Sequence, residues 1–180
     1  MALLGKLLRR FRAGAAKSPL AGTDFIAPAA LTVTSTAFTD GGPIPKANAG
    51  KKIGDNVSPP LSVRGIPEGT QQLVLFFEDL DVPGPKPLMH TAAVIEPGVT
   101  ELAAGDLGPA GATGVRLVKA FGESYVGPAP IAGHGPHHYR FVVLALDTPV
   151  PAGVADHNAL LAASAGHVLA RGDVTGTYER

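Results

Sequence analysis

The 180-residue chain contains no cysteine, and only 6% of its residues are aromatic. The lack of cysteine excludes disulfide bonds, thiolate metal ligands and a cysteine nucleophile. There is also no excess of charge of either sign, because the formal net charge is zero. A protein that binds nucleic acid usually carries a basic excess, so we do not expect a nucleic-acid partner.

The sequence also lacks the roughly 18 consecutive apolar residues that a transmembrane helix needs. Its N-terminus instead has an amphipathic pattern, and basic residues interrupt the apolar run in a way that is not typical of a signal peptide. We therefore expect a cytoplasmic protein. The apolar positions are Leu3, Leu4, Leu7, Leu8 and Phe11, and the basic positions are Lys6, Arg9, Arg10 and Arg12.

Three interpretations of this N-terminal helix stay open. It packs on the domain or on a partner subunit, it binds a membrane surface, or it is a frayed tail. Basic amphipathic helices favour anionic lipid, which supports weak association with a membrane surface.

Apolar residues make up 45% of the chain, which has the length of one domain with a substantial core. The 23 glycines and 17 prolines follow no repeat, so we expect many turns and long connections rather than a helix bundle. We assign residues 1–30 to an N-terminal helix and a linker, and residues 31–180 to a single domain.

Strands dominate the predicted secondary structure. Residues 31–38 alternate between threonines and less polar residues, which is a strand pattern. The apolar runs 72–78, 88–95 and 139–147 predict buried strands, and a last strand is expected at 173–178.

Two long segments and one helix complete the prediction. Residues 39–60 and 96–136 are rich in Gly and Pro and read as long connections, which are often functional. Asp156 is a candidate N-cap for a helix over residues 157–170, which Gly172 would end.

Polar side chains gather at the ends of three predicted strands. Asp79 and Asp81 follow the first, His90 lies in the second, and His137 and Tyr139 lead into the third. If these strands are neighbours, the side chains meet at one rim of the sheet. Hydrogen-bond donors from histidine, tyrosine and backbone N–H groups near Gly127 would suit phosphate, acetate or a phospholipid head group.

Three segments resemble signatures of the phosphatidylethanolamine-binding protein (PEBP) family. SPPLSVRGIPEGTQQLVLFFEDLDVP resembles its aspartate turn, MHTAAVI its histidine strand, and YVGPAPIAGHGPHHYRFVVLALD its second signature. HVLARGDVTGTYER is similar to the end of the bacterial YbhB/YbcL-type, Raf kinase inhibitor-like branch. The resemblance assigns the family's anion pocket to Asp79, Asp81, His90, Gly127, Pro128, His137 and Tyr139.

This resemblance implies an all-β, antiparallel sandwich-like fold with a peripheral C-terminal helix. It also implies a protein that binds a small anion or a phosphoethanolamine-like head group, without enzyme activity, cofactor or metal. A regulatory or inhibitory role towards a kinase or a protease would follow, and bacterial members favour a homodimer.

The chain departs from the family pattern at several positions. Leu80 replaces the usual proline between the aspartates, Thr91 stands where a tryptophan is common, and Ile131 replaces a proline. His138 stands where an arginine is typical, which removes a fixed positive charge and weakens the transfer of kinase binding. We expect His134 and His138 to be loop and surface residues.

Two aspartates beside a bound anion require an explanation, because like charges repel. One aspartate can hold a histidine ring in the tautomer that donates a hydrogen bond. Alternatively, an aspartate can contact the ammonium group of phosphoethanolamine.

Two other classes of site stay open. The two aspartates, His90 and His137 have suitable atoms for a divalent metal ion, although no close ligand spacing such as HExxH is present. A serine hydrolase would need Ser58 or Ser124 as its nucleophile, but the sequence has no GxSxG motif.

Overall fold

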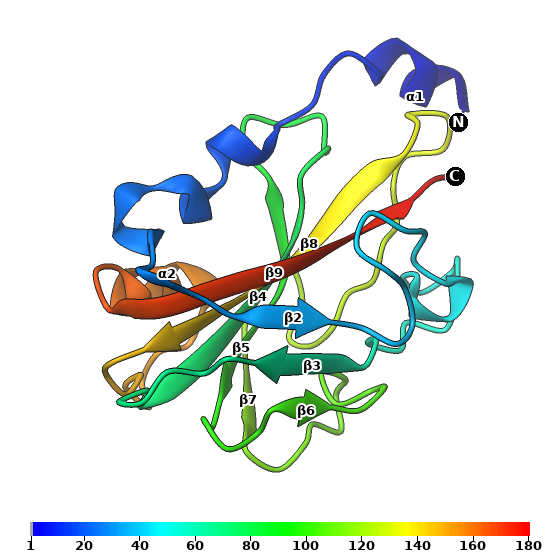
Figure 1. Cartoon of the computed structure of the whole chain (residues 1–180). Helices are drawn as coiled ribbons and strands as arrows, with labels where there is room; N and C mark the ends of the chain where they lie inside the picture. Colours follow the sequence, from blue (N-terminus) through cyan, green and yellow to red (C-terminus); the bar gives the residue numbers. More distant parts are fainter. Residues whose placement is uncertain (1) are drawn as a thin grey trace.

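A computed structural model describes residues 2–180. Its strands are β1 (Ala29–Ala30), β2 (Thr32–Thr34), β3 (Leu61–Arg64), β4 (Gln72–Asp79), β5 (Leu88–Ile95), β6 (Glu101–Leu102), β7 (Val115–Val118), β8 (His137–Leu146) and β9 (Val168–Tyr178). They form a six-stranded sheet of order β1-β9-β8-β4-β5-β7 and a three-stranded sheet of order β2-β3-β6 (Figure 1). Only the β1–β9 ladder is parallel among these described strands. The predicted all-β fold is confirmed.

The central strands β4 and β8 are buried on both faces of the large sheet. In β4, Leu73, Leu75 and Phe77 belong to the core shared with the small sheet. Val74 and Phe76 belong to a second core on the opposite face. This burial explains why the predicted strands appear in the sequence as continuous apolar runs instead of alternating patterns.

The other predicted strands fit the structure to different degrees. Residues 88–95 form β5 with the predicted bounds. The strand expected at residues 31–38 is shorter and covers only Thr32–Thr34, where Val33 is buried between exposed threonines. The long connection over residues 96–136 contains the short strands β6 and β7.

The two α-helices, α1 (Ala2–Leu8) and α2 (His157–Ser164), are short. Among residues 2–180, no helix has the length and apolar character that crossing a bilayer requires. Asp156 caps α2 as predicted, because its Oδ1 accepts the N–H groups of Asn158 and Ala159.

The predicted end of this helix at residue 170 is wrong. Gly166 has a φ of 78°, which turns the chain out of the helix. Val168 then begins β9 and pairs with Leu146. Gly172, expected to end the helix, lies inside β9, where its Cα packs closely against the backbone of Leu31.

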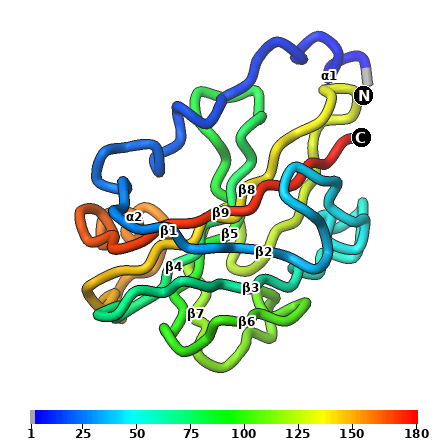
Figure 2. Tube along the Cα trace, viewed as in Figure 1, coloured from blue at the N-terminus to red at the C-terminus, as the bar shows by residue number. Residues whose placement is uncertain are grey.

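The segment between α1 and β1 runs along the large sheet (Figure 2). It contains the 3-10 helices Ala15–Lys17, Pro19–Ala21 and Thr23–Phe25, and it buries Leu20 and Phe25 in the second core. The Ser18 hydroxyl donates to the buried Glu78 carboxylate at 2.7 Å. The predicted linker is thus packed on the domain, whereas the division of the chain at residue 30 stays a prediction.

We predict that Gly172→Ala destabilises the fold by about 1–3 kcal/mol, because overpacking against a fixed backbone forces the strands to shift. An added Cβ would overlap the carbonyl oxygen of Leu31. The matched control is Gly98→Ala, since nothing lies within 4 Å of its Cβ position. Urea unfolding of both variants measures the difference, and equal midpoints would contradict the prediction.

Candidate functional site

The site begins with the pairing of β4 between β5 and β8. Asp79 lies opposite Tyr139 of β8 and opposite Leu88 of β5. The β4–β5 register shifts between Phe77 and Glu78, and His90 lies at this irregularity. The ends of the three strands therefore bring the aspartate turn, His90 and the start of β8 to one edge of the sheet.

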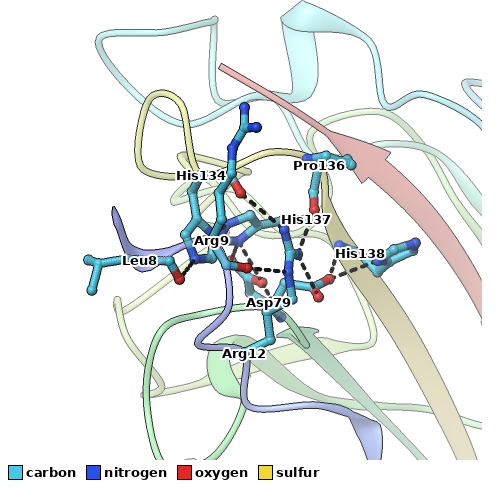
Figure 3. A network of polar contacts seen from close by, with 9 residues as sticks. Leu8, Arg9, Arg12, Asp79, His134, Pro136, His137 and His138 are labelled. Carbon is cyan, nitrogen blue, oxygen red and sulfur yellow. Dashed lines mark hydrogen bonds and ion pairs between the residues drawn. The ribbon is translucent and has the colours of Figure 1, made fainter. Parts of the chain in front are cut away.

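A chain of buried polar groups crosses this edge (Figure 3). His137 Nδ1 lies 2.8 Å from Asp79 Oδ2, and the two side chains are only 1% and 3% exposed. His137 Nε2 lies 2.6 Å from His134 Nδ1, and His134 Nε2 lies 2.9 Å from the carbonyl oxygen of Leu8 in α1. His134 is fully buried, so the surface position expected for it is wrong.

The hydrogen-bond partners of these side chains determine which of their atoms carry protons. A carbonyl oxygen only accepts, so His134 Nε2 carries a hydrogen and donates to Leu8. Asp79 also accepts the N–H of Asp81 at 2.9 Å, which fits an ionised carboxylate facing a protonated His137 Nδ1. One more proton must lie between the two facing ring nitrogens. Asp79 and the histidine pair thus share three protons and are electrically neutral as a group, so the pair balances Asp79.

Asp81 is paired separately. Its carboxylate lies 2.7 Å from Arg12 Nη1 and accepts the backbone N–H of His138 at 2.7 Å. Burial raises the pKa of Asp81, but the hydrogen bonds from Arg12 and His138 outweigh it and hold this pKa below its ordinary value. The His138 ring is half exposed, in agreement with its expected surface position.

Tyr139 is the one described residue with a buried side-chain polar atom that lacks a hydrogen-bond partner. Its ring lies 5.6 Å from that of His90 and 6.2 Å from that of His137, measured between centroids. Burial, the negative charge of Asp79 and the approach of its carboxylate to the hydroxyl raise the pKa of Tyr139, while the Ala129 backbone acts in the opposite direction. The hydroxyl therefore keeps its proton, and neither neighbour has the geometry of a hydrogen bond with it. A buried hydroxyl without a partner is uncommon and points to a missing contact.

In its neutral form, the His90 ring beside Tyr139 offers a hydrogen-bond acceptor. Its Nδ1 lies 2.9 Å from the Val126 carbonyl oxygen and therefore donates to it. Burial lowers the pKa of His90, although the Val126 carbonyl and the charge of Asp79 act in the opposite direction. The ring is thus neutral at pH 7, and its other nitrogen, Nε2, carries a lone pair.

Gly127 and Pro128 shape the loop beside His90 rather than offer donors. The Gly127 N–H donates to Asn56 Oδ1 at 2.9 Å, and the Pro128 carbonyl accepts the N–H of Gly50 at 2.9 Å. The Gly127 N–H itself, in the region where backbone donors were expected, is therefore already engaged. Gly127 is required there because a Cβ would overlap the carbonyl oxygen of Asn48.

The cluster is enclosed in this structure. Asp79, His90, His137 and Tyr139 are all buried. A cavity of about 580 Å³ lies next to them, lined partly by Phe121, Val126 and Ala129. The Phe121 ring, which lines this cavity and is largely exposed, lies 5.9 Å from that of His90.

The two alternative sites find no direct support. Within residues 2–180, no group of three or more acidic or histidine side chains is arranged to hold a metal ion. Ser58 is buried, and its hydroxyl oxygen accepts the N–H groups of Gly105 and Leu107. No hydrogen bond joins Ser58 or Ser124 to a histidine in the described part of the chain.

Two contributors to the site were not predicted. The spacing of His134 and His137 in GHGPHH could have suggested a histidine pair, although spacing alone does not show that a turn brings the rings together. Arg12 had no comparable signal, because its partner Asp81 lies far along the chain.

The sequence and the two-sheet fold define a known class of protein. Residues 34–179 match the family model of the phosphatidylethanolamine-binding proteins. The chain belongs to this family.

Particular relatives agree with this assignment. UPF0098 protein Rv1910c of Mycobacterium tuberculosis is 39% identical over 153 residues, which cover 83% of this chain and 70% of the relative. The structure of Escherichia coli YbcL, a member of the mammalian PEBP family, has a TM-score of 0.78 at 28% identity and covers 84% of this chain and 99% of that chain. The PEBP homolog CT736 of Chlamydia trachomatis has a TM-score of 0.71 at 32% identity, with 84% and 98% covered.

We predict that Asp79→Asn lowers the free energy of unfolding by about 3–5 kcal/mol, because it removes one partner of a buried charge-balanced pair. The matched control is Asp147→Asn. Asp147 lies 2.9 Å from His167 Nδ1, but both side chains are about half exposed. This exposed pair should contribute less than about 1 kcal/mol. Chemical unfolding at neutral pH compares the two, and similar losses would show that the buried pair is not ionised.

Proposed function

We propose that this protein is a binding module for a small phosphate-bearing anion of the phosphoethanolamine type, and that the buried cluster around Tyr139 is its binding site. The unpartnered Tyr139 hydroxyl carries this proposal. It is a donor whose pKa is raised, so it stays protonated and can donate to a phosphate oxygen. Membership of the PEBP family supports the same ligand class.

The neighbours of Tyr139 divide the recognition between two parts of the ligand. His90 can donate a second hydrogen bond to a phosphate oxygen once its Nε2 takes up a proton. The histidine pair balances Asp79, so the cluster offers no net positive charge to a dianion and favours a ligand whose ammonium group offsets part of its phosphate charge. The site therefore suits phosphoethanolamine better than inorganic phosphate.

Because the cluster is enclosed, the ligand has to displace part of the loop between β7 and β8. The Val126 carbonyl of this loop holds His90, and His134 of the same loop covers His137. Binding then exchanges contacts of this loop for contacts of the ligand. Such a movement also provides a surface change that a protein partner could recognise, which fits a regulatory role.

We expect Tyr139→Phe to reduce the affinity for phosphoethanolamine by about tenfold, because it removes one hydrogen bond to a charged group. The variant should lose less than about 1 kcal/mol of stability, since the hydroxyl approaches Asp79 and the Ala129 backbone without the geometry of a hydrogen bond. NMR titration of backbone amides and histidine side chains measures the affinity.

The control for this experiment is Tyr125→Phe. The Tyr125 hydroxyl is also buried, but it donates to the Asn48 carbonyl at 2.9 Å. This variant should lose about 1 kcal/mol of stability and keep its affinity. If Tyr139→Phe binds as tightly as the parent, or if no amide near residues 79–90 and 125–139 shifts, the proposed site is wrong.

We further expect the affinity for sulfate to rise as the pH falls from about 7 to about 5.5, because the anion needs the protonated form of His90. Burial lowers the pKa of His90, so the free protein lacks this proton at pH 7. Sulfate keeps its own charge over this range, so the protein alone sets the trend.

In His90→Gln, an amide replaces the titrating ring, and the pH profile should become flat. The other titratable groups around His90 are Asp79, His137 and Tyr139, and they are unchanged in this variant. A pH-dependent affinity that persists in His90→Gln would assign the proton to another group.

A further inference from the structure

The amphipathic helix α1 is attached to the domain by the side that carries its smallest residue. Gly5 faces the loop before β8, and a Cβ at this position would overlap the carbonyl oxygen of Ala132. At the end of the helix, the Leu8 carbonyl accepts from His134, and Arg9 Nε donates to the Gly133 carbonyl at 2.8 Å. Backbone contacts therefore hold α1, and its leucine side chains do not pack into the core.

The apolar side of α1 faces solvent as a consequence. Figure 1 shows α1 at the rim of the molecule, beside the start of β8 and the end of β9. The exposed side chains are Leu3 (73% exposed), Leu4 (56%), Leu7 (69%) and Phe11 (63%). We call these four residues the N-terminal apolar patch. Such a concentration of large exposed apolar side chains on a short segment marks an interaction surface.

The charged residues in the sequence that carries this patch all have one sign, although Arg12 is already paired with Asp81. Lys6, Arg9, Arg10, Arg12 and Lys17 are the charged residues of the first 23 positions, and the first acidic residue is Asp24. The whole chain is neutral, so this cluster is a local concentration of positive charge. An open groove of about 420 Å³ continues the patch between Phe11, Lys17 and Pro85.

We propose that the N-terminal apolar patch and its basic residues dock the protein on an anionic lipid surface. Leucine and phenylalanine side chains that already face outward can enter the acyl region without unfolding the helix, while lysine and arginine contact lipid phosphates. A second copy of this chain fits the patch poorly, because two symmetric patches would bring the same positive charges together.

The docked orientation places the candidate site near the membrane. The loop that holds α1 is the same loop that supplies His134 and leads into His137. Arg12 donates to the carbonyls of His134 and Pro136 in this loop and also pairs with Asp81 (Figure 3). A lipid surface bound at α1 therefore lies against the segment that encloses the cluster.

The test is co-sedimentation of the full chain with vesicles of phosphatidylcholine, with and without phosphatidylglycerol. We expect binding to the anionic vesicles only, and its loss at high salt, because salt screens exposed charges. The double variant Leu4→Ser/Leu7→Ser should reduce the partition by about tenfold or more. Arg10→Glu should also weaken it, and Arg10 makes no hydrogen bond or ion pair with the rest of residues 2–180.

Matched controls separate docking from general effects. Ile26 is 72% exposed but lies outside the patch, so Ile26→Ser should leave binding unchanged. Lys52→Glu makes the same charge change as Arg10→Glu far along the chain and should have a much smaller effect. Tyr139→Phe should still dock, which keeps the outcome independent of the proposed ligand site.

Three results would overturn the proposal. The first is the absence of binding to anionic vesicles, and the second is equal binding to neutral and anionic vesicles. The third is an oligomer in light scattering that the double leucine variant converts to monomers without any vesicle binding, since the patch would then contact a second copy. Circular dichroism of each variant confirms that the fold is retained.

Discussion

The register of β4 against β8 is the constraint on which the candidate site depends. It places Asp79 opposite Tyr139 and within 2.8 Å of the His137 ring. A shift of one residue would turn every side chain of the strand to the opposite face. Because both faces of these strands are packed into cores, such a shift would exchange two well-filled apolar layers. The hydrophobic pattern thus positions the polar groups, and the polar groups need no separate means of alignment.

The charges at this edge are neutralised in pairs before any ligand arrives. The histidine pair balances Asp79, Arg12 and His138 pair with Asp81, and Arg140 Nη2 lies 2.6 Å from the buried Glu78. A buried charge without a partner is costly, so each pair supports the folded state mainly by avoiding that cost. What distinguishes the cluster is the hydroxyl of Tyr139, which remains without a hydrogen bond of proper geometry.

The sequence predicts the features that depend on local pattern. Continuous apolar runs predict the central strands, and Asp156 predicts the start of α2. The polar residues at the ends of the predicted strands indicate the group that contains Asp79, His90, His137 and Tyr139. The failures come from contacts between distant segments. The end of α2 depends on the pairing of Val168 with Leu146, and the burial of His134 depends on the Leu8 carbonyl 126 residues away. The hydrogen bond from the Gly127 N–H to Asn56 is likewise a contact between distant segments, which no local pattern identifies.

The contacts of residues 8–14 also bear on where this protein can be divided. Similarity to the family begins at residue 34, yet the loop before β8 is held by Leu8, Arg9 and Arg12. The Ala13 and Gly14 N–H groups donate to the carbonyls of Val82 and Leu80 in the aspartate turn. A protein trimmed to residues 34–179 would keep every residue of the cluster and lose the contacts that hold both loops around it. The span that matches the family model and the span joined by these hydrogen bonds therefore differ, and the second is the longer of the two.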